Sequence, residues 1–198
     1  MTRILLIDDH EASRLGVSDL LRQSGYEVVA ERASGGSVVA LAREKNPDVV
    51  FLAIGLSDLD GIDGIMVAEE IIRAKPLPVV LISRRHDAKI VERAKSAGVM
   101  AYLVNPLRAE QLRPTIELAL AHFQQLASLR AENATLKETL EARKIIERAK
   151  GLLMEQKKVT EEQAYWLIKK TSMNMRKPMA DVAQAILLAG GLLARDKR

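Results

Sequence analysis

Residues 49–61, VVFLAIGLSDLDG, indicate how the first part of the chain folds. Their apolar run ends at Ala53, and a loop with two glycines and two aspartates follows. Residues 3–10, RILLIDDH, have the same form, but two adjacent carboxylates, Asp8 and Asp9, follow their apolar run. Short apolar runs that end at turn residues are typical of strands buried on both faces of a parallel sheet.

Five such runs predict five strands, and helical patterns separate them. The strands are expected at residues 3–7, 26–31, 48–53, 79–83 and 100–104. The first helical pattern places Leu15, Leu20 and Leu21 on one face and ends at Gly25, while the last places Ile90, Val91 and Ala94 inward and ends at Gly98. Strands that alternate with helices of this length predict right-handed crossovers and a parallel sheet covered on both faces.

The carboxyl ends of these strands are where such a sheet binds ligands. The residues at these ends are Asp8, Asp9, Ala53, Ser83 and Asn105. Two adjacent carboxylates repel each other, and a divalent cation or an ammonium group normally offsets that repulsion. The alternative is a structural role for the two acids, as the N-cap and first-turn acid of the next helix.

The segments ILLIDDH, PDVVFLAIGLSDLDG, PVVLIS and GVMAYLVNP resemble, in this order, the signatures of a two-component response-regulator receiver domain. The resemblance covers residues 1–121 and implies an α/β fold with a flavodoxin-like, doubly wound, five-stranded parallel sheet. In that family the paired acids hold Mg²⁺, an aspartate at the end of the third strand accepts a phosphoryl group, and a lysine precedes the proline after the fifth strand. The resemblance also assigns Ser83 to the hydroxyl position and Tyr102 to the aromatic position.

Two positions depart from the family pattern, since Ala53 replaces the acceptor aspartate and Asn105 replaces the lysine. Alanine has no oxygen that can attack phosphorus, and Mg²⁺ loses one expected ligand, so only weak Mg²⁺ binding at the paired acids is expected. Asp58 and Asp60 follow in the loop as possible substitutes. We therefore predict a degenerate receiver that takes no phosphate and acts as a dimerisation or docking platform. It is either switched by a partner protein or a histidine kinase, or not switched at all.

A heptad pattern marks residues 122–142 as a coiled-coil linker helix. Its seam consists of Leu126, Leu129, Asn133, Leu136 and Leu140. Asparagine at an a position favours two-stranded pairing, and Glu132 at g faces Lys137 at e of a parallel partner, so we predict a homodimer. The alternative is that this seam packs against the chain's own domains.

The last segment, residues 143–192, predicts a small all-α domain of three helices. The apolar faces of the three helices are Ile145, Ile146, Ala149, Leu152 and Leu153; Ala164, Leu167, Ile168 and Thr171; and Met179, Val182, Ala183, Ile186 and Leu187. Thr160 and Gln163 have the spacing of a capping box at the start of the second helix. Pro178 suits the first turn of the third helix, which is expected to end at Gly190 and Gly191.

The basic charge of the chain lies in this C-terminal part. Residues 1–123 have 15 Lys+Arg and 17 Asp+Glu, a net charge of −2, whereas residues 124–198 have 15 and 9, a net charge of +6. The candidate RNA contacts are Arg143, Lys144, Arg148, Lys150, Gly151, Tyr165, Lys169, Lys170, Arg176 and Lys177. Cations beside a stacking ring fit unpaired RNA bases better than duplex DNA. We expect Trp166 to be a core anchor and Tyr165 to be the stacking residue.

The stretch ARKIIERAKGLLMEQKKVTEEQAYWLIKKTSMNMRKPMADVAQAIL resembles an ANTAR domain, the transcription-antitermination output module of certain response regulators. The resemblance implies that a dimer binds two neighbouring hairpins in a leader RNA and so prevents an overlapping terminator from forming. Lys150 and Gly151 belong to its most recognisable motif. A glycine inside a helix costs about 1 kcal/mol relative to alanine, which suggests close approach of a base, or close helix packing, at Gly151.

Other classes of protein have less support. The chain has no cysteine, no secretory signal pattern and no apolar stretch near the ~20 residues that cross a bilayer, so we expect a cytoplasmic protein without a membrane partner. His10, His86 and His122 are scattered, and no HExxH, GxSxG or Walker motif occurs, which disfavours an enzyme. A DNA-binding response regulator and a protein-interaction adaptor remain alternatives.

Overall fold

The computed structural model describes residues 1–33, 38–55, 63–84 and 88–195. The chain divides into two compact units, Met1–Ala127 and Ser128–Arg198, and each is described by itself. The loop acids Asp58 and Asp60 lie outside the described residues. No helix in the described ranges is both long and apolar enough to cross a membrane.

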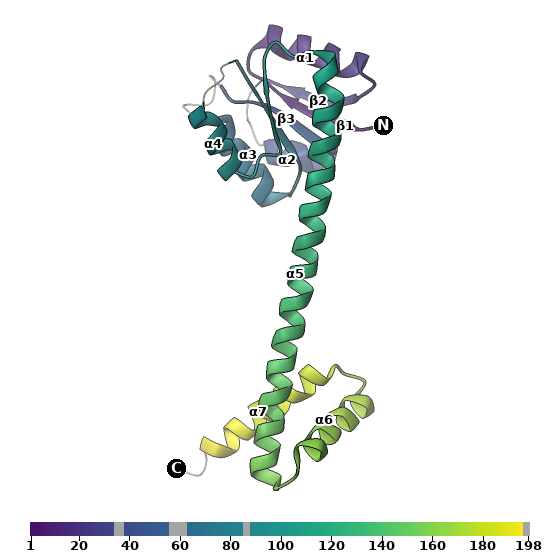
Figure 1. The fold of residues 1–198 in the computed structure, drawn as a ribbon, viewed down its shortest axis with the longest axis vertical. Helices are drawn as coiled ribbons and strands as arrows, with labels where there is room; N and C mark the ends of the chain where they lie inside the picture. The colour runs from purple at the N-terminus through teal and green to yellow at the C-terminus, as the bar shows by residue number, and fades with distance from the viewer. Residues whose placement is uncertain (34–37, 56–62, 85–87, 196–198) are drawn as a thin grey trace. The chain divides into compact units, whose positions relative to one another are not determined.

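The first unit is built on a five-stranded sheet (Figure 1). Its strands are β1 (Arg3–Ile7), β2 (Glu27–Arg32), β3 (Val49–Ala53), β4 (Val79–Ser83) and β5 (Ala101–Val104). Their order is β2-β1-β3-β4-β5, and all neighbouring pairs are parallel. The predicted doubly wound parallel sheet is therefore confirmed, although β2, β3 and β5 each begin one residue later than expected.

Helices cover both faces of this sheet. They are α1 (Glu11–Gln23), α2 (Val38–Lys45), α3 (Gly64–Ala74), α4 (Ala88–Ser96) and the first turns of α5 (Ala109–Lys157). One apolar cluster joins α2, α3 and α4 to one face of the sheet, and a second joins α1 and α5 to the other face. Every residue of β3 and β4 is buried, as expected for strands covered on both sides.

The predicted inner face of α1 was partly wrong. Leu15 is 52% exposed, while Val17 and Leu21 are buried against the sheet. Residues four apart lie on the same helix face, so Val17 and Leu21 share a face that Leu15 does not reach. The predicted helix ends are confirmed, because Gly25 and Gly98 follow α1 and α4 with φ angles of +87° and +81°.

The second unit contains the C-terminal part of α5, α6 (Glu161–Met175) and α7 (Met179–Arg195). Its buried apolar residues are Ala149, Leu153, Ala164, Ile168, Val182 and Ala183. The three predicted helices are present, and Pro178 directly precedes α7. The predicted end at Gly190 and Gly191 was wrong, because α7 continues to Arg195. Two glycines weaken a helix, but the leucines and alanine that follow them favour its continuation.

The buried stripe of α6 is narrower than predicted. Ala164 and Ile168 are completely buried, but Leu167 is 39% exposed and Thr171 is exposed. The Thr171 hydroxyl donates a hydrogen bond of 2.8 Å to the Leu167 carbonyl oxygen instead of packing in the core. Because only two other helices pack against α6 in the described part of this unit, they cover only the narrow stripe formed by Ala164 and Ile168.

Candidate functional site

The strand ends of the first unit form a small polar pocket. Its lining residues are Asp8, Asp9, Ser13, Ala53, Gly55, Ile82, Ser83, Arg84 and Asn105. The structure thus brings together the five strand-end residues that the sequence singled out. The cavity measures about 20 Å³, which is room for about one water molecule. Tyr102 lies on β5 and packs, partly buried, against the cluster on the α2–α4 face of the sheet.

Protein donors already satisfy the buried acid of this pocket. The Asp8 carboxylate accepts hydrogen bonds from the His10 backbone N–H at 2.9 Å and from the Ser13 hydroxyl at 2.6 Å. The Asn105 side-chain amide donates to the Ser13 hydroxyl oxygen at 2.9 Å. An uncharged chain of donors therefore runs from Asn105 through Ser13 to Asp8, and it links the ends of β5 and β1 through α1.

Asn105 uses both ends of its side chain in this arrangement. Its Oδ1 accepts a hydrogen bond of 3.2 Å from the Leu107 backbone N–H, which fixes the turn after β5. A lysine could not accept that bond, because its ammonium group only donates. Replacing the family's lysine by Asn105 therefore has two effects. It removes a positive charge from the pocket, and it adds a hydrogen-bond acceptor that holds the loop after β5.

Sequence reasoning missed Ser13, and the alternative interpretation that made the paired acids the cap of the next helix is not borne out. His10, and not Asp8 or Asp9, is the N-cap of α1, where its Nδ1 accepts the Ser13 backbone N–H at 3.2 Å. Ser13 lies in the first turn of the helix that follows the paired acids. The sequence signal that could have identified the Asn105–Ser13–Asp8 network was a serine in the first turn of the helix after the paired acids, combined with an asparagine at the end of the fifth strand.

The residues of the pocket do not fit a tightly bound Mg²⁺ ion. Ala53 contributes no side-chain oxygen, and both oxygens of Asp8 accept bonds from protein donors. Within the described ranges, no group of three or more acidic, histidine or cysteine side chains is placed to hold a metal. Side-chain coordination would depend on the two carboxylates of Asp8 and Asp9, which makes a weak site.

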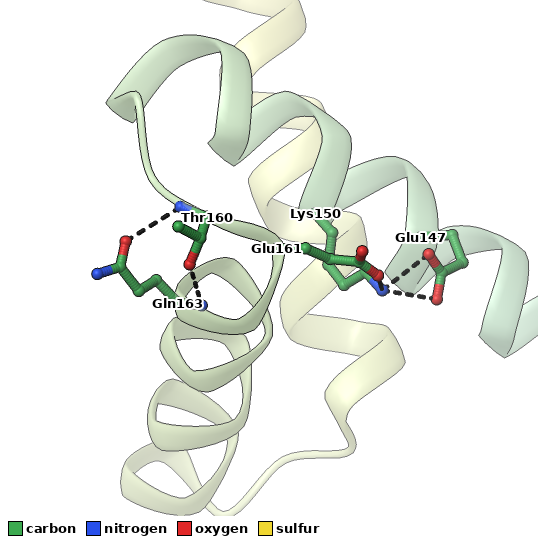
Figure 2. Close-up of polar contacts among 5 residues, drawn as sticks. All are labelled: Glu147, Lys150, Thr160, Glu161 and Gln163. Atoms are coloured by element: carbon green, nitrogen blue, oxygen red, sulfur yellow. Dashed lines mark hydrogen bonds and ion pairs between the residues drawn. The ribbon is translucent and has the colours of Figure 1, made fainter.

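In the second unit, Lys150, one of the candidate RNA contacts, is not exposed at the surface. Its side chain is only 10% exposed, and its Nζ donates to Glu147 at 2.9 Å and to Glu161 at 2.7 Å (Figure 2). The hydrogen bond that Lys150 donates to Glu147, followed by the one it donates to Glu161, raises the pKa of Lys150, and Lys150 in turn lowers the pKa of Glu161. This lysine ties α5 to the start of α6.

The predicted capping box at the start of α6 is confirmed (Figure 2). The Thr160 hydroxyl oxygen accepts the Gln163 backbone N–H at 3.3 Å, and the Gln163 side-chain oxygen accepts the Thr160 backbone N–H at 3.0 Å. The capping box and the Lys150–Glu161 ion pair together determine where α6 begins.

The other cations that we predicted to contact RNA lie at the surface of this unit. Arg143, Lys144, Arg148, Lys170, Arg176 and Lys177 are exposed, and Lys169 is half-buried. Lys144 forms an exposed ion pair of 2.7 Å with Glu141. Gly151 faces open space, since a Cβ built there would meet nothing within 4 Å, so close helix packing does not explain this glycine.

The two aromatic residues of α6 are both exposed. Tyr165 is 40% exposed, and Trp166, which we expected to anchor the core, is 55% exposed. The Lys169 Nζ lies 5.0 Å from the centroid of the Trp166 ring. The prediction that Trp166 anchors the core was wrong, because Ala164 and Ile168 already form the contact between α6 and the neighbouring helices.

Family models match both units of this chain. Residues 4–117 match the response regulator receiver domain, and residues 134–187 match the ANTAR domain. The chain is a response regulator with an ANTAR domain. These matches agree with the resemblances noted in the sequence, including the order of the two domains.

Among relatives of this response regulator, the transcriptional regulatory protein PdtaR of Mycobacterium tuberculosis is 40% identical over 93% of this chain and 89% of its own length. A putative transcriptional regulator of Pseudomonas aeruginosa is 31% identical over 62% of this chain and 58% of its own. The response regulator protein VraR of Staphylococcus aureus is 33% identical over 58% of this chain and 54% of its own. The first of these therefore shares both units with this response regulator.

Solved receiver structures match the first unit. The signal receiver domain of a modulated diguanylate cyclase from Desulfovibrio desulfuricans is 25% identical, with a TM-score of 0.58, and covers 63% of this chain and 98% of its own. A two-component response regulator of the LuxR family from Aurantimonas is 30% identical, with a TM-score of 0.55, and covers 68% and 99%. These likenesses agree with the flavodoxin-like receiver fold.

Proposed function

We propose that this response regulator is a homodimeric RNA-binding protein that prevents transcription termination, and that its receiver works without phosphate. The match of residues 134–187 to the ANTAR domain carries this proposal. Residues 1–121 act as the receiver, 122–142 as the dimer linker and 143–192 as the RNA-binding module. The expected ligand is a structured leader RNA with paired hairpins, bound in the cytoplasm.

The surface of the second unit supports RNA as the ligand. The C-terminal 75 residues have a net charge of +6, and the cations on α5 and α6 are largely exposed. Exposed cations bind phosphates, whereas the exposed indole and phenol rings on α6 are suited to unpaired bases. The matches to a receiver domain and an ANTAR domain support a regulatory function rather than an enzymatic one.

The pocket of the first unit supports a receiver that takes no phosphate. Ala53 lacks a nucleophilic oxygen, and Asn105 is engaged with Ser13 and Leu107. The receiver then serves as a platform for a partner protein, and a histidine kinase can bind it without transferring phosphate. Acetyl phosphate with Mg²⁺ should produce no phosphoryl adduct by intact mass, and a stable adduct would refute this part of the proposal.

Four leucines on α5 support the homodimer. Leu126, Leu129, Leu136 and Leu140 are between 40% and 62% exposed, although they follow a heptad seam. Apolar side chains in such a line are stabilised when a second helix covers them. Replacing Leu129 and Leu136 with lysine should yield monomers by light scattering, and a dimer of unchanged mass would count against this seam.

Gel shifts with an RNA of two stem-loops test the main function. The RNA should bind in preference to a DNA duplex of the same stem sequence, with affinity that falls steeply as salt rises. Preference for the duplex would favour the alternative, a DNA-binding response regulator. The absence of any salt-dependent nucleic-acid binding would favour a protein-interaction adaptor.

A further inference from the structure

We propose that Trp166 is a stacking platform on which an unpaired RNA base lies, with Lys169 and Lys170 binding the adjacent phosphates. This inference rests on the proposed RNA-binding function and identifies the residues that carry it. It reverses the roles that the sequence suggested, in which Trp166 was a core anchor and Tyr165 the stacking ring.

Trp166 lies on one face of α6 with three other residues that are exposed or half-buried. Trp166, Lys169, Lys170 and Met173 are spaced i, i+3, i+4 and i+7, and such residues line one side of a helix. We call these four residues the Trp166 face. Trp166 is 55% and Met173 is 67% exposed. The buried stripe of Ala164 and Ile168 lies on a different side of α6, so the small core forms without the indole ring.

The ammonium group of Lys169 lies against the indole ring of Trp166. Its Nζ lies 5.0 Å from the ring centroid, within the range of a cation–π contact. This contact favours one orientation of the ring and still leaves more than half of the side chain accessible to solvent. An accessible ring with a lysine beside it offers a stacking surface and a phosphate contact at neighbouring points.

The charges around the Trp166 face indicate the direction in which the RNA strand runs. Lys170 lies one turn after Trp166, and Arg176 and Lys177 are exposed at the C-terminal end of the same helix. Glu162, one turn before Trp166, is also exposed and would repel phosphate. The strand should therefore pass from Trp166 toward the turn between α6 and α7. These flanking cations favour a nucleic acid over an apolar protein surface.

Trp166 is the single tryptophan of the chain, so its fluorescence reports on this site alone. The whole 198-residue chain is titrated with a pool of two-stem-loop RNAs whose loops are randomised, and with the same stems as loopless duplexes. The loop pool should quench the Trp166 emission as binding saturates, and the duplexes should not. Saturated binding by gel shift with unchanged emission would overturn stacking on Trp166 but not RNA binding. If no RNA binds even at low salt, the proposed function itself fails.

Substitutions of the two rings distinguish Trp166 from its neighbour. Trp166→Ala should weaken binding of the loop pool roughly 5- to 150-fold, the usual range for losing one stacked base, while Trp166→Phe should retain most of the affinity. Tyr165→Ala should have the smaller effect. The side chain is exposed, so circular dichroism should report an unchanged fold. A loss of dimer mass in Trp166→Ala would assign the ring to a protein interface and overturn the proposal.

Lys169 and Lys170 form a matched pair for the cation contact. Lys169→Gln and Lys170→Gln each remove one charge from the same helix face, but the contact with the ring belongs to Lys169. Both variants should bind RNA less tightly, with a salt slope lowered by about one phosphate contact. Only Lys169→Gln should change the Trp166 emission of the free protein. Identical emission in the two variants would show that Lys169 does not position the ring.

Discussion

The receiver pocket and the Trp166 face use polar side chains in opposite ways. In the pocket, the buried carboxylate of Asp8 is satisfied by Ser13 and the His10 backbone, and Asn105 completes the network. On the Trp166 face, an aromatic ring and two lysines remain accessible to solvent. A polar group that the protein itself satisfies stabilises the fold, whereas an accessible one is free to bind a ligand.

The two units also differ in how much buried apolar surface supports them. The sheet unit has an apolar cluster on each face, and its central strands are completely buried. The ANTAR unit depends on six buried apolar residues, three of which are alanines. A core of this size leaves little stability in reserve, so a single core substitution should affect the second unit more than the first.

The largest effect is expected from Ile168→Ala, which tests whether the small core supports the ANTAR unit alone. Removing a completely buried isoleucine side chain costs about 2–5 kcal/mol. Calorimetry should show a lower transition for the ANTAR unit and an unchanged transition for the sheet unit. Leu167→Ala, on the exposed neighbour, is the control and should change little. If both transitions move together, the two units are not independent and the comparison breaks.

The second prediction concerns the backbone that supports the pocket. A Cβ added at Gly64 would lie 2.1 Å from the Ala53 carbonyl oxygen, so Gly64→Ala must displace the start of α3 or the end of β3. We expect a loss of about 1–3 kcal/mol in the free energy of unfolding, measured with denaturant. Gly16→Ala is the matched control, because Gly16 lies within α1 and a Cβ added there would meet no other atom within 4 Å. This substitution should raise the free energy of unfolding by about 1 kcal/mol. Equal effects would indicate that the pocket backbone is not tightly packed.

A third prediction tests the capping box of α6. Thr160→Ala removes the acceptor for the Gln163 backbone N–H and should lower the stability of the ANTAR unit by about 0.5–2 kcal/mol in thermal unfolding. Thr171→Ala in the same helix should be close to neutral, since its hydroxyl bonds only to a carbonyl already used by the helix. A neutral Thr160→Ala would show that packing, and not the cap, determines where α6 begins.

The smallest effect is expected at Lys150, and it depends on pH. Lys150 lowers the pKa of Glu161, so their pairing stabilises the fold above the ordinary pKa of a glutamate and is lost as the pH falls through the lowered value. Lys150→Met should therefore lower the Tm at neutral pH, and the difference from the unaltered protein should shrink in acid. Lys144→Met, which breaks an exposed pair with Glu141, should change the Tm very little. If the Tm difference between Lys150→Met and the unaltered protein does not change with pH, the effect comes from packing of the lysine's aliphatic chain and not from the ion pair.

Patterns that depend on local geometry were predicted well from the sequence. Alternation of strands and helices predicted the sheet, and two glycines marked the ends of α1 and α4. The capping box was correct because its two hydrogen bonds join residues three apart. The strand-end residues could be placed in one pocket, because parallel strands bring their carboxyl ends to the same edge of the sheet.

Burial of individual side chains was predicted less well. Leu15, Leu167 and Trp166 are apolar or aromatic, yet each is more than a third exposed, because neighbouring residues already fill the contacts of their helices. Lys150 shows the reverse, since two glutamates allow its charge to lie at the edge of a core. The number of neighbours around a helix, which sequence periodicity does not contain, decided these cases.

The sequence by itself determined the order of the elements, the caps, the missing acceptor at Ala53 and the excess of positive charge in the last helices. Each depends on residue type or on spacing along the chain. Only the tertiary structure decided that Asn105 reaches Asp8 through Ser13, that Lys150 turns inward and that Trp166 turns outward. These contacts join residues whose distance in space depends on how helices and strands pack, so chain spacing alone could not place them.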